Sequence, residues 1–135
     1  MRILPALASA LILSAASTTA EAACGRCDPI FNVADAPATS ASGKALTNDQ
    51  VRQAIIRAGA ALGWVMKENG PGKLSANLAV RKHTAEIEIP YSSKGYSINY
   101  KNSTNLDAAD GQIHKNYNGW IQNLNKGINA QLSAS

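Results

Sequence analysis

The first residues whose type and spacing can support chemistry are two cysteines, in the motif Cys24-Gly25-Arg26-Cys27. Two cysteines at this spacing pair with each other in an oxidising compartment. Redox enzymes place such a motif at the N-terminus of a helix, where the helix dipole lowers the pKa of one thiol. No helix signal follows Cys27, so the motif predicts a structural disulfide, with a thiol-disulfide active protein as the alternative. Two cysteines supply half of the four ligands of a structural zinc site, so we expect no metal or cofactor.

Glu86 and Glu88 form a second candidate pair, because alternate residues of a strand point to the same face. Two carboxylates so placed can serve acid-base chemistry. We favour the alternative interpretation, a solvated strand face with Arg81 or Lys101 opposite the two carboxylates. The two histidines, His83 and His114, are predicted to be surface or capping residues. The sequence has no nucleophile elbow, zinc-protease motif or phosphate loop, so we do not expect an enzyme.

The N-terminal segment, residues 1–22, has the three parts of a secretory signal peptide. Arg2 supplies a positive charge, an uncharged apolar run follows from Ile3 to Ala16, and Ala20-Glu21-Ala22 is a cleavage signal. The apolar run is shorter than the roughly 20 residues that a membrane span needs, so we expect no transmembrane span after cleavage. The mature chain is expected to be periplasmic or secreted. Lipid attachment at Cys24 is an alternative, although an aliphatic residue is usual at the position that Glu21 occupies.

Charge and composition narrow the possible partners. The predicted signal peptide carries one charge of each sign, so the net charge of +4 is unchanged by cleavage. The cations are scattered and form no cluster, which argues against nucleic-acid binding. Residues 23–46 contain few periodic apolar residues and are predicted to be a flexible leader, in which the apolar patch at Ile30, Phe31 and Val33 can dock as an edge strand. The remainder, 47–135, fits a single domain.

The domain is predicted to begin with a helix over about 48–62. Thr47 and Gln50 form a capping-box pattern, apolar residues follow at helical spacing, and Gly63 suits the position after the helix. A period of two follows, with short strands over about 64–68, 74–81, 85–91 and 96–101. A second amphipathic helix is predicted over about 111–132. The order is therefore α-β-β-β-β-α, an α+β domain with a four-stranded antiparallel meander.

Both helices have an apolar stripe and the sheet has one apolar face, and these surfaces need to be buried. A two-layer arrangement, with both helices packed on one face of the sheet, buries all of them. The other face of the sheet then stays open to solvent. Its predicted residues are small or polar: Ser75, Asn77, Ala79, Arg81, Glu86, Glu88, Ser97, Asn99 and Lys101. Of these, Arg81, Glu86, Glu88, Asn99 and Lys101 are the candidates for binding a partner.

Aromatic residues are few and concentrated in the predicted layers. Core packing explains most of them, and a gap between the helices over these residues is the default place for a small-molecule site. The candidate pocket residues are Trp64, Tyr96, Tyr100 and Trp120.

Three segments, VRQAIIRAGAALGW (51–64), HTAEIEIPYSSKGYSINYKNSTNL (83–106) and IHKNYNGWIQNL (113–124), resemble a group of small proteins. These are uncharacterised exported proteins and predicted lipoproteins of Gram-negative bacteria. The resemblance covers about residues 31–132 and implies a location in the cell envelope, without implying any chemistry.

These observations favour an exported cell-envelope protein that acts as a non-catalytic binding or interaction module. Its partner would be an unknown envelope protein or a small ligand. Two alternatives stay open: a small-ligand carrier with a pocket between helices and sheet, and a thiol-disulfide active protein that uses Cys24 and Cys27.

Overall fold

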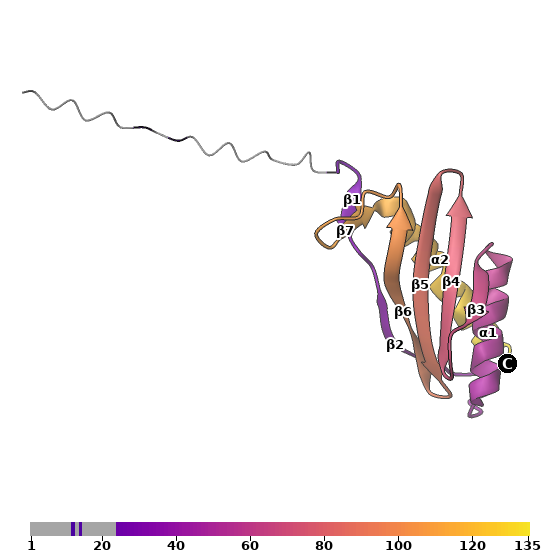
Figure 1. Cartoon of the computed structure of the whole chain (residues 1–135). Coiled ribbons are helices and arrows are strands. Elements are labelled where there is room, and N and C mark those ends of the chain that lie inside the picture. The colour runs from indigo at the N-terminus through magenta and orange to yellow at the C-terminus, as the bar shows by residue number, and fades with distance from the viewer. Residues whose placement is uncertain (1–11, 13, 15–23) are drawn as a thin grey trace, which may run out of the picture.

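The computed structural model describes residues 12, 14 and 24–135. Apart from residues 12 and 14, the predicted signal peptide over 1–22 lies outside the described residues. Within 24–135 the chain forms two helices and seven strands (Figure 1). In chain order these are β1 (Cys27–Pro29), β2 (Val33–Pro37), α1 (Asn48–Ala61), β3 (Val65–Glu68), β4 (Lys73–Val80), β5 (His83–Ser92), β6 (Gly95–Thr104), β7 (Gln112–His114) and α2 (Lys115–Ser133).

The main sheet has five antiparallel strands in the order β2-β6-β5-β4-β3. The prediction of an α+β fold is confirmed, and the four consecutive strands β3 to β6 pair as a meander. The predicted number of four strands is wrong, because β2 adds a fifth strand beside β6. Val33 pairs with Ile98 and Ala36 with Tyr96, and the register shifts between these two pairs.

The segment 23–46, predicted as a flexible leader in which Ile30, Phe31 and Val33 can dock as an edge strand, contains two strands in the structure. Its described part contributes β2 to the main sheet and β1 to a separate two-stranded sheet with β7. Val33 and Leu46 are buried in the domain core. This segment can be ordered with few apolar residues, because the backbone groups of its strands form hydrogen bonds with a neighbouring strand.

Helix α1 follows the sequence prediction closely. The Thr47 side chain accepts a hydrogen bond from the backbone N–H of Gln50, and the Gln50 side chain accepts one from the N–H of Thr47, so the capping box is confirmed. Gly63 follows the helix with φ of +90°, a conformation that favours glycine. Arg52 then joins α1 to the edge strand β3, through an ion pair with Glu68.

Helix α2 starts later than predicted. The expected start near Gly111 is wrong, because residues 112–114 form β7 and the helix begins at Lys115. Strand β7 is extended because it pairs with β1, a partner that lies more than 80 residues earlier in the chain. The His114 side chain caps the helix by accepting a hydrogen bond from the N–H of Asn116, at 3.1 Å.

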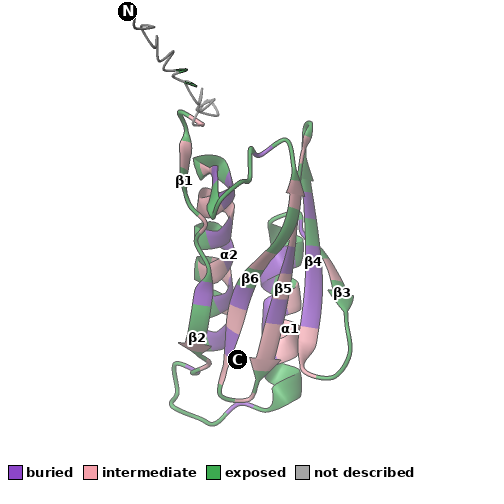
Figure 2. Ribbon diagram, turned by 60° about the vertical axis from the view of Figure 1, so that its left-hand side comes forward, coloured by how far each residue is buried: buried purple, intermediate pink, exposed green. Residues whose placement is uncertain are grey.

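Both helices cover one face of the main sheet (Figures 1 and 2). Leu78, Ile87 and Ile98 come from three different strands and are all buried beneath the helices, as the alternating pattern predicts. Helix α2 contributes a continuous buried stripe to the same seam: Tyr117, Ile121, Leu124, Ile128 and Leu132. The apolar core therefore lies between the helices and the sheet. Among the described residues, no helix combines the length and apolar composition required to cross a membrane.

Candidate functional site

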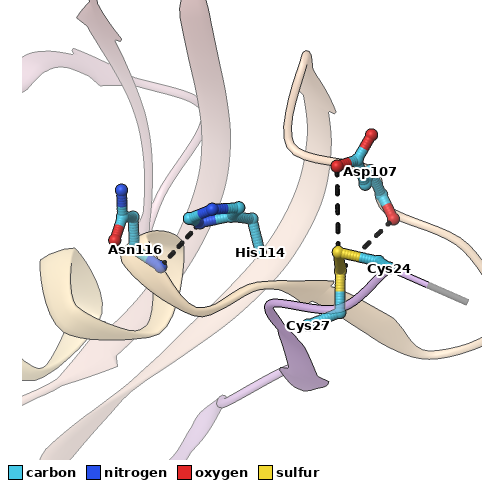
Figure 3. Close-up of a disulfide and its surroundings, with 5 residues drawn as sticks. All are labelled: Cys24, Cys27, Asp107, His114 and Asn116. Atoms are coloured by element: carbon cyan, nitrogen blue, oxygen red, sulfur yellow. Dashed lines mark hydrogen bonds between the residues drawn. A yellow bond between two sulfur atoms is a disulfide. The ribbon is translucent and has the colours of Figure 1, made fainter.

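Cys24 and Cys27 lie at disulfide distance, with their sulfur atoms 2.01 Å apart (Figure 3). They enclose the turn that leads into β1. Both sulfur atoms face Asp107: Cys24 Sγ is 3.8 Å from its Oδ2, and Cys27 Sγ is 4.0 Å from its carbonyl oxygen. A disulfide sulfur carries no proton, so these are packing contacts that hold the turn against the loop before β7.

The surroundings of the disulfide suit a structural clip better than a redox centre. A reactive cysteine needs a positive environment that stabilises its thiolate. Here the Asp107 carboxylate lies 3.8 Å from Cys24 Sγ, and its negative charge disfavours a thiolate. Cys27 stands opposite His114 in the β1–β7 pair, but the His114 ring turns toward Asn116 (Figure 3).

The two histidines have separate roles in the fold. His83 Nδ1 lies 2.7 Å from the carbonyl oxygen of Asn105, and His114 Nδ1 caps α2. In the part of the chain that the structure describes, no three histidine, cysteine or acidic side chains gather as a possible metal site. These residues therefore position loops and a helix end.

The open face of the sheet carries its charges as pairs. Glu86 lies 3.5 Å from the Lys101 ammonium, and Glu88 lies 3.6 Å from that of Lys73. Asn99 is on the same face, paired with Glu88 across β5 and β6. The fifth candidate, Arg81, differs: it lies in the turn between β4 and β5 with φ of +55°, outside both strands. Each carboxylate faces a lysine, which favours a solvated face over an acid-base pair.

The four aromatic residues predicted to line a pocket do not share one. Trp64 and Tyr96 are buried in the core between helices and sheet. Tyr100 packs edge-on against Tyr117, with 5.5 Å between ring centroids. Trp120 is half-buried, packs partly against the core and also lines a surface hollow along α2. The structure therefore fills the space where a small-molecule pocket was expected.

Two buried tyrosine hydroxyls in this core differ in their surroundings. The Tyr96 hydroxyl donates to the side-chain oxygen of Asn125 and lies 3.1 Å from that of Asn129. The Tyr117 hydroxyl is fully buried and has no hydrogen-bond partner among the described residues. Burial raises the pKa of Tyr96 to about 12 and raises that of Tyr117 further, because a phenolate loses its hydration inside the core.

A hollow of about 640 Å³ lies along α2, where the segment from β1 to β2 crosses it. This volume falls within the range of ligand pockets, roughly 300–1,000 Å³. We call it the α2 hollow. Its lining combines two aromatic residues, one proline, four amide residues and one glycine of α2, and one charge of each sign. These residues are Asp28, Pro29, Phe31, Lys115, Asn116, Asn118, Gly119, Trp120, Gln122 and Asn123.

Asn118 holds one wall of the α2 hollow in place. Its side-chain nitrogen donates to the Pro29 carbonyl at 2.9 Å, and its side-chain oxygen accepts from the Phe31 N–H at 2.9 Å. Both ends of this amide are thus used to fix the crossing segment on α2. The Phe31 ring, 37% exposed, is thereby kept beside the hollow.

Three other amides of the α2 hollow are free to bind something else. The side chains of Asn116, Gln122 and Asn123 form no hydrogen bond with any described part of the chain and lie at the surface. Each offers one acceptor and two donors. The hollow therefore presents half-buried aromatic surface beside unused hydrogen-bonding groups.

Sequence reasoning placed Trp120 with the core, and in the structure Trp120 packs partly against the core and also lines the α2 hollow. Sequence reasoning missed Phe31 as a site residue and the amides of α2. The available signal was the run KNYNGWIQN, in which amide side chains occupy the positions between the buried residues of the helix. Comparisons of the chain with known protein families, curated proteins and solved structures find no match.

Proposed function

We propose that this protein is an exported, non-catalytic binding module of the cell envelope, and that the α2 hollow is its ligand-binding surface. The observation that carries the proposal is the hollow itself. It has the volume of a ligand site, a half-buried tryptophan and three amides with no partner in the described chain. Such a combination of apolar surface and a few polar groups is typical of binding sites.

Export is supported by the signal-peptide pattern of residues 1–22 and by the cysteine pair. A disulfide-distance pair is compatible with an oxidising compartment outside the cytoplasm. A non-catalytic role is supported by the open face, where Glu86 and Glu88 each face a lysine. The packing around Trp64 and Tyr96 favours a site on the outside of α2 over a carrier pocket beneath the helices.

The two tryptophans allow a direct test, because they lie in different places. Trp64 is 3% exposed in the core, whereas Trp120 lines the α2 hollow. The Trp64→Phe variant therefore carries a single fluorescent reporter in the hollow. We expect its emission to shift in a saturable way when the mature protein is titrated with fractionated envelope extract.

The matched control is Trp120→Phe, which keeps the core tryptophan alone. Its emission should not respond to the same fractions. An equal response from both variants, or none from either, contradicts a binding site in the α2 hollow. Circular dichroism of both variants verifies that each is folded, and the wild-type protein with both tryptophans provides a third measurement of the same shift.

The export part of the proposal is tested by the intact mass of the protein recovered from the envelope fraction. We expect a chain that starts at Ala23 and is two hydrogen atoms lighter than the dithiol form. A full-length chain in the cytoplasmic fraction would contradict export, and an added diacylglyceryl mass at Cys24 would show lipid attachment.

A further inference from the structure

We infer that the ligand of the α2 hollow is a neutral saccharide chain, an inference that rests on the proposed function. It is carried by three features of the hollow: its charge, its pairing of aromatic and amide groups, and the glycine in its floor.

The charge of the lining argues for a neutral ligand. Asp28 and Lys115 contribute one charge of each sign, and the remaining lining residues are uncharged. The rest of the mature chain carries an excess of cations, so a site for an anionic polymer would be expected to include several of them. A neutral ligand also avoids the cost of desolvating a charge without a partner.

The chemistry of the lining fits the two sides of a sugar ring. A pyranose presents a face of C–H groups and a rim of hydroxyls. The electron-rich faces of Trp120 and Phe31 can receive the C–H side. The side chains of Asn116, Gln122 and Asn123 offer both donors and acceptors, which a hydroxyl needs because it donates and accepts at once.

Gly119 gives an independent indication that something approaches the helix here. A glycine inside a helix is unfavourable compared with alanine. At Gly127, the other glycine of α2, an added Cβ would already be in van der Waals contact with Ala58 of α1 at 3.4 Å, so the crossing of the two helices leaves little room for a larger side chain. At Gly119 an added Cβ would meet nothing within 4 Å. Packing does not explain Gly119, whereas close approach of a ligand ring to the backbone in the floor of the hollow does.

The inference predicts how binding responds to substitution. In the full mature protein, Trp120→Ala and Gly119→Ala should each weaken binding of the neutral oligosaccharide at least about tenfold, a difference equivalent to about 1.4 kcal/mol. Gly119→Ala should do so while leaving the protein folded and no less stable. Titration calorimetry measures the affinity of these variants, because Trp120→Ala removes the fluorescent reporter. Two glutamines of the same helix provide a matched pair of variants, because Gln122 lines the hollow and Gln131 does not. Both are replaced by alanine. Gln122→Ala alone should weaken binding.

The experiment uses the Trp64→Phe protein, whose remaining tryptophan reports on the hollow. It is titrated with short oligomers of N-acetylglucosamine and of glucose, and with oligogalacturonate as the anionic comparison, each to about 10 mM. We expect a neutral oligomer to shift the emission of Trp120, with little dependence on salt, and the anionic one not to. In a second arm, an envelope fraction that shifts the emission is treated with hot dilute acid, which cleaves glycosidic bonds and leaves most peptide bonds intact, or with a protease.

The outcomes separate this inference from the proposed function. Loss of the shift after acid hydrolysis, with survival after protease, supports a saccharide. A shift that survives acid hydrolysis, or a preference for the anionic oligomer, overturns the saccharide inference but leaves a binding site in the hollow. Failure of every fraction and every oligomer to shift the emission overturns both.

Discussion

The two sides of helix α2 show two different uses of the same element. Its inner side, with Ile121 and Leu124, is fully buried in the seam between helices and sheet (Figure 2). Its outer side carries Trp120 and Gln122 beside a hollow of about 640 Å³. The inner side stabilises the fold by removing apolar surface from water. The outer side carries three amide side chains that form no hydrogen bond with the described chain, beside Trp120, which packs partly against the core, and this is why we assign binding to it.

The largest expected difference between the two sides comes from truncating neighbouring residues. Ile121→Ala should lower the free energy of unfolding by about 2–5 kcal/mol, because it leaves a cavity in a filled core. Gln122→Ala, one position later and exposed, should change it by less than about 0.5 kcal/mol. Urea unfolding of both variants measures the contrast. Similar losses in the two variants would mean that the outer side also holds the fold together.

Alkaline pH should weaken the inner side selectively. The pKa of Tyr96 is raised to about 12, and that of Tyr117 is raised as well, so the folded protein keeps protons that the unfolded chain releases near pH 10. The two protonated tyrosines therefore contribute fully to the free energy of unfolding below about pH 10. This contribution is lost as the pH rises through their folded-state pKa, and for Tyr96 the loss is on the order of 2 kcal/mol. Urea midpoints at about pH 8 and about pH 11 should show the decline. In Tyr96→Phe the decline should be shallower, and an equal slope in both proteins would disprove this cause.

The disulfide should matter for the wall of the α2 hollow and less for the core. Replacing Cys24 and Cys27 with serine opens a short loop, which costs about 2 kcal/mol or less. Hydrogen exchange should rise first in β1 and β7, since the clip holds their junction. Ligand binding in the hollow should weaken together with this local loss. A uniform rise of exchange across β4 to β6 would instead show that the clip supports the whole domain.

Two tyrosine-to-phenylalanine substitutions should move stability in opposite directions. Tyr117→Phe removes a buried hydroxyl that has no partner in the described chain and should raise the free energy of unfolding by about 1 kcal/mol. Tyr96→Phe removes a hydroxyl that bonds to Asn125 and should lower it by about 1 kcal/mol. Thermal unfolding at neutral pH compares them. If Tyr117→Phe is also destabilising, its hydroxyl has a partner that the present structure does not contain, such as a buried water.

The smallest expected effect separates the two glycines of α2. Gly119→Ala should raise the free energy of unfolding by up to about 1 kcal/mol, since alanine favours the helix and the new methyl group enters open space. Gly127→Ala should gain less, because its methyl group would touch Ala58 of α1 at 3.4 Å. Chemical denaturation of both variants tests this order. The reverse order would remove the evidence that Gly119 is kept for a reason other than packing.

The local pattern of the sequence determined much of the fold. Thr47 and Gln50 marked the start of α1, and the period-two runs through Leu78, Ile87 and Ile98 marked the buried face of the meander. These features could be predicted because each depends on residues close together in the chain: a cap spans three positions, and alternation fixes the face of a strand wherever its partner lies.

Only the tertiary structure decided the parts that join distant segments. The apolar patch at Ile30, Phe31 and Val33 indicated an edge strand, but the partners of β1 and β2 could not be predicted, because β7 and β6 lie far away in the chain. The α2 hollow arises in the same way, since Asn118 fixes the crossing of Pro29 and Phe31 over a helix that begins more than 80 residues later. The sequence predicted that Trp120 joins the core, but it could not predict that Trp120 also lines a hollow. The helical period shows which side of α2 is buried, and it does not show which segment crosses the opposite side. The sequence by itself thus determined the core of this protein, and contacts between remote segments decided where a ligand can bind.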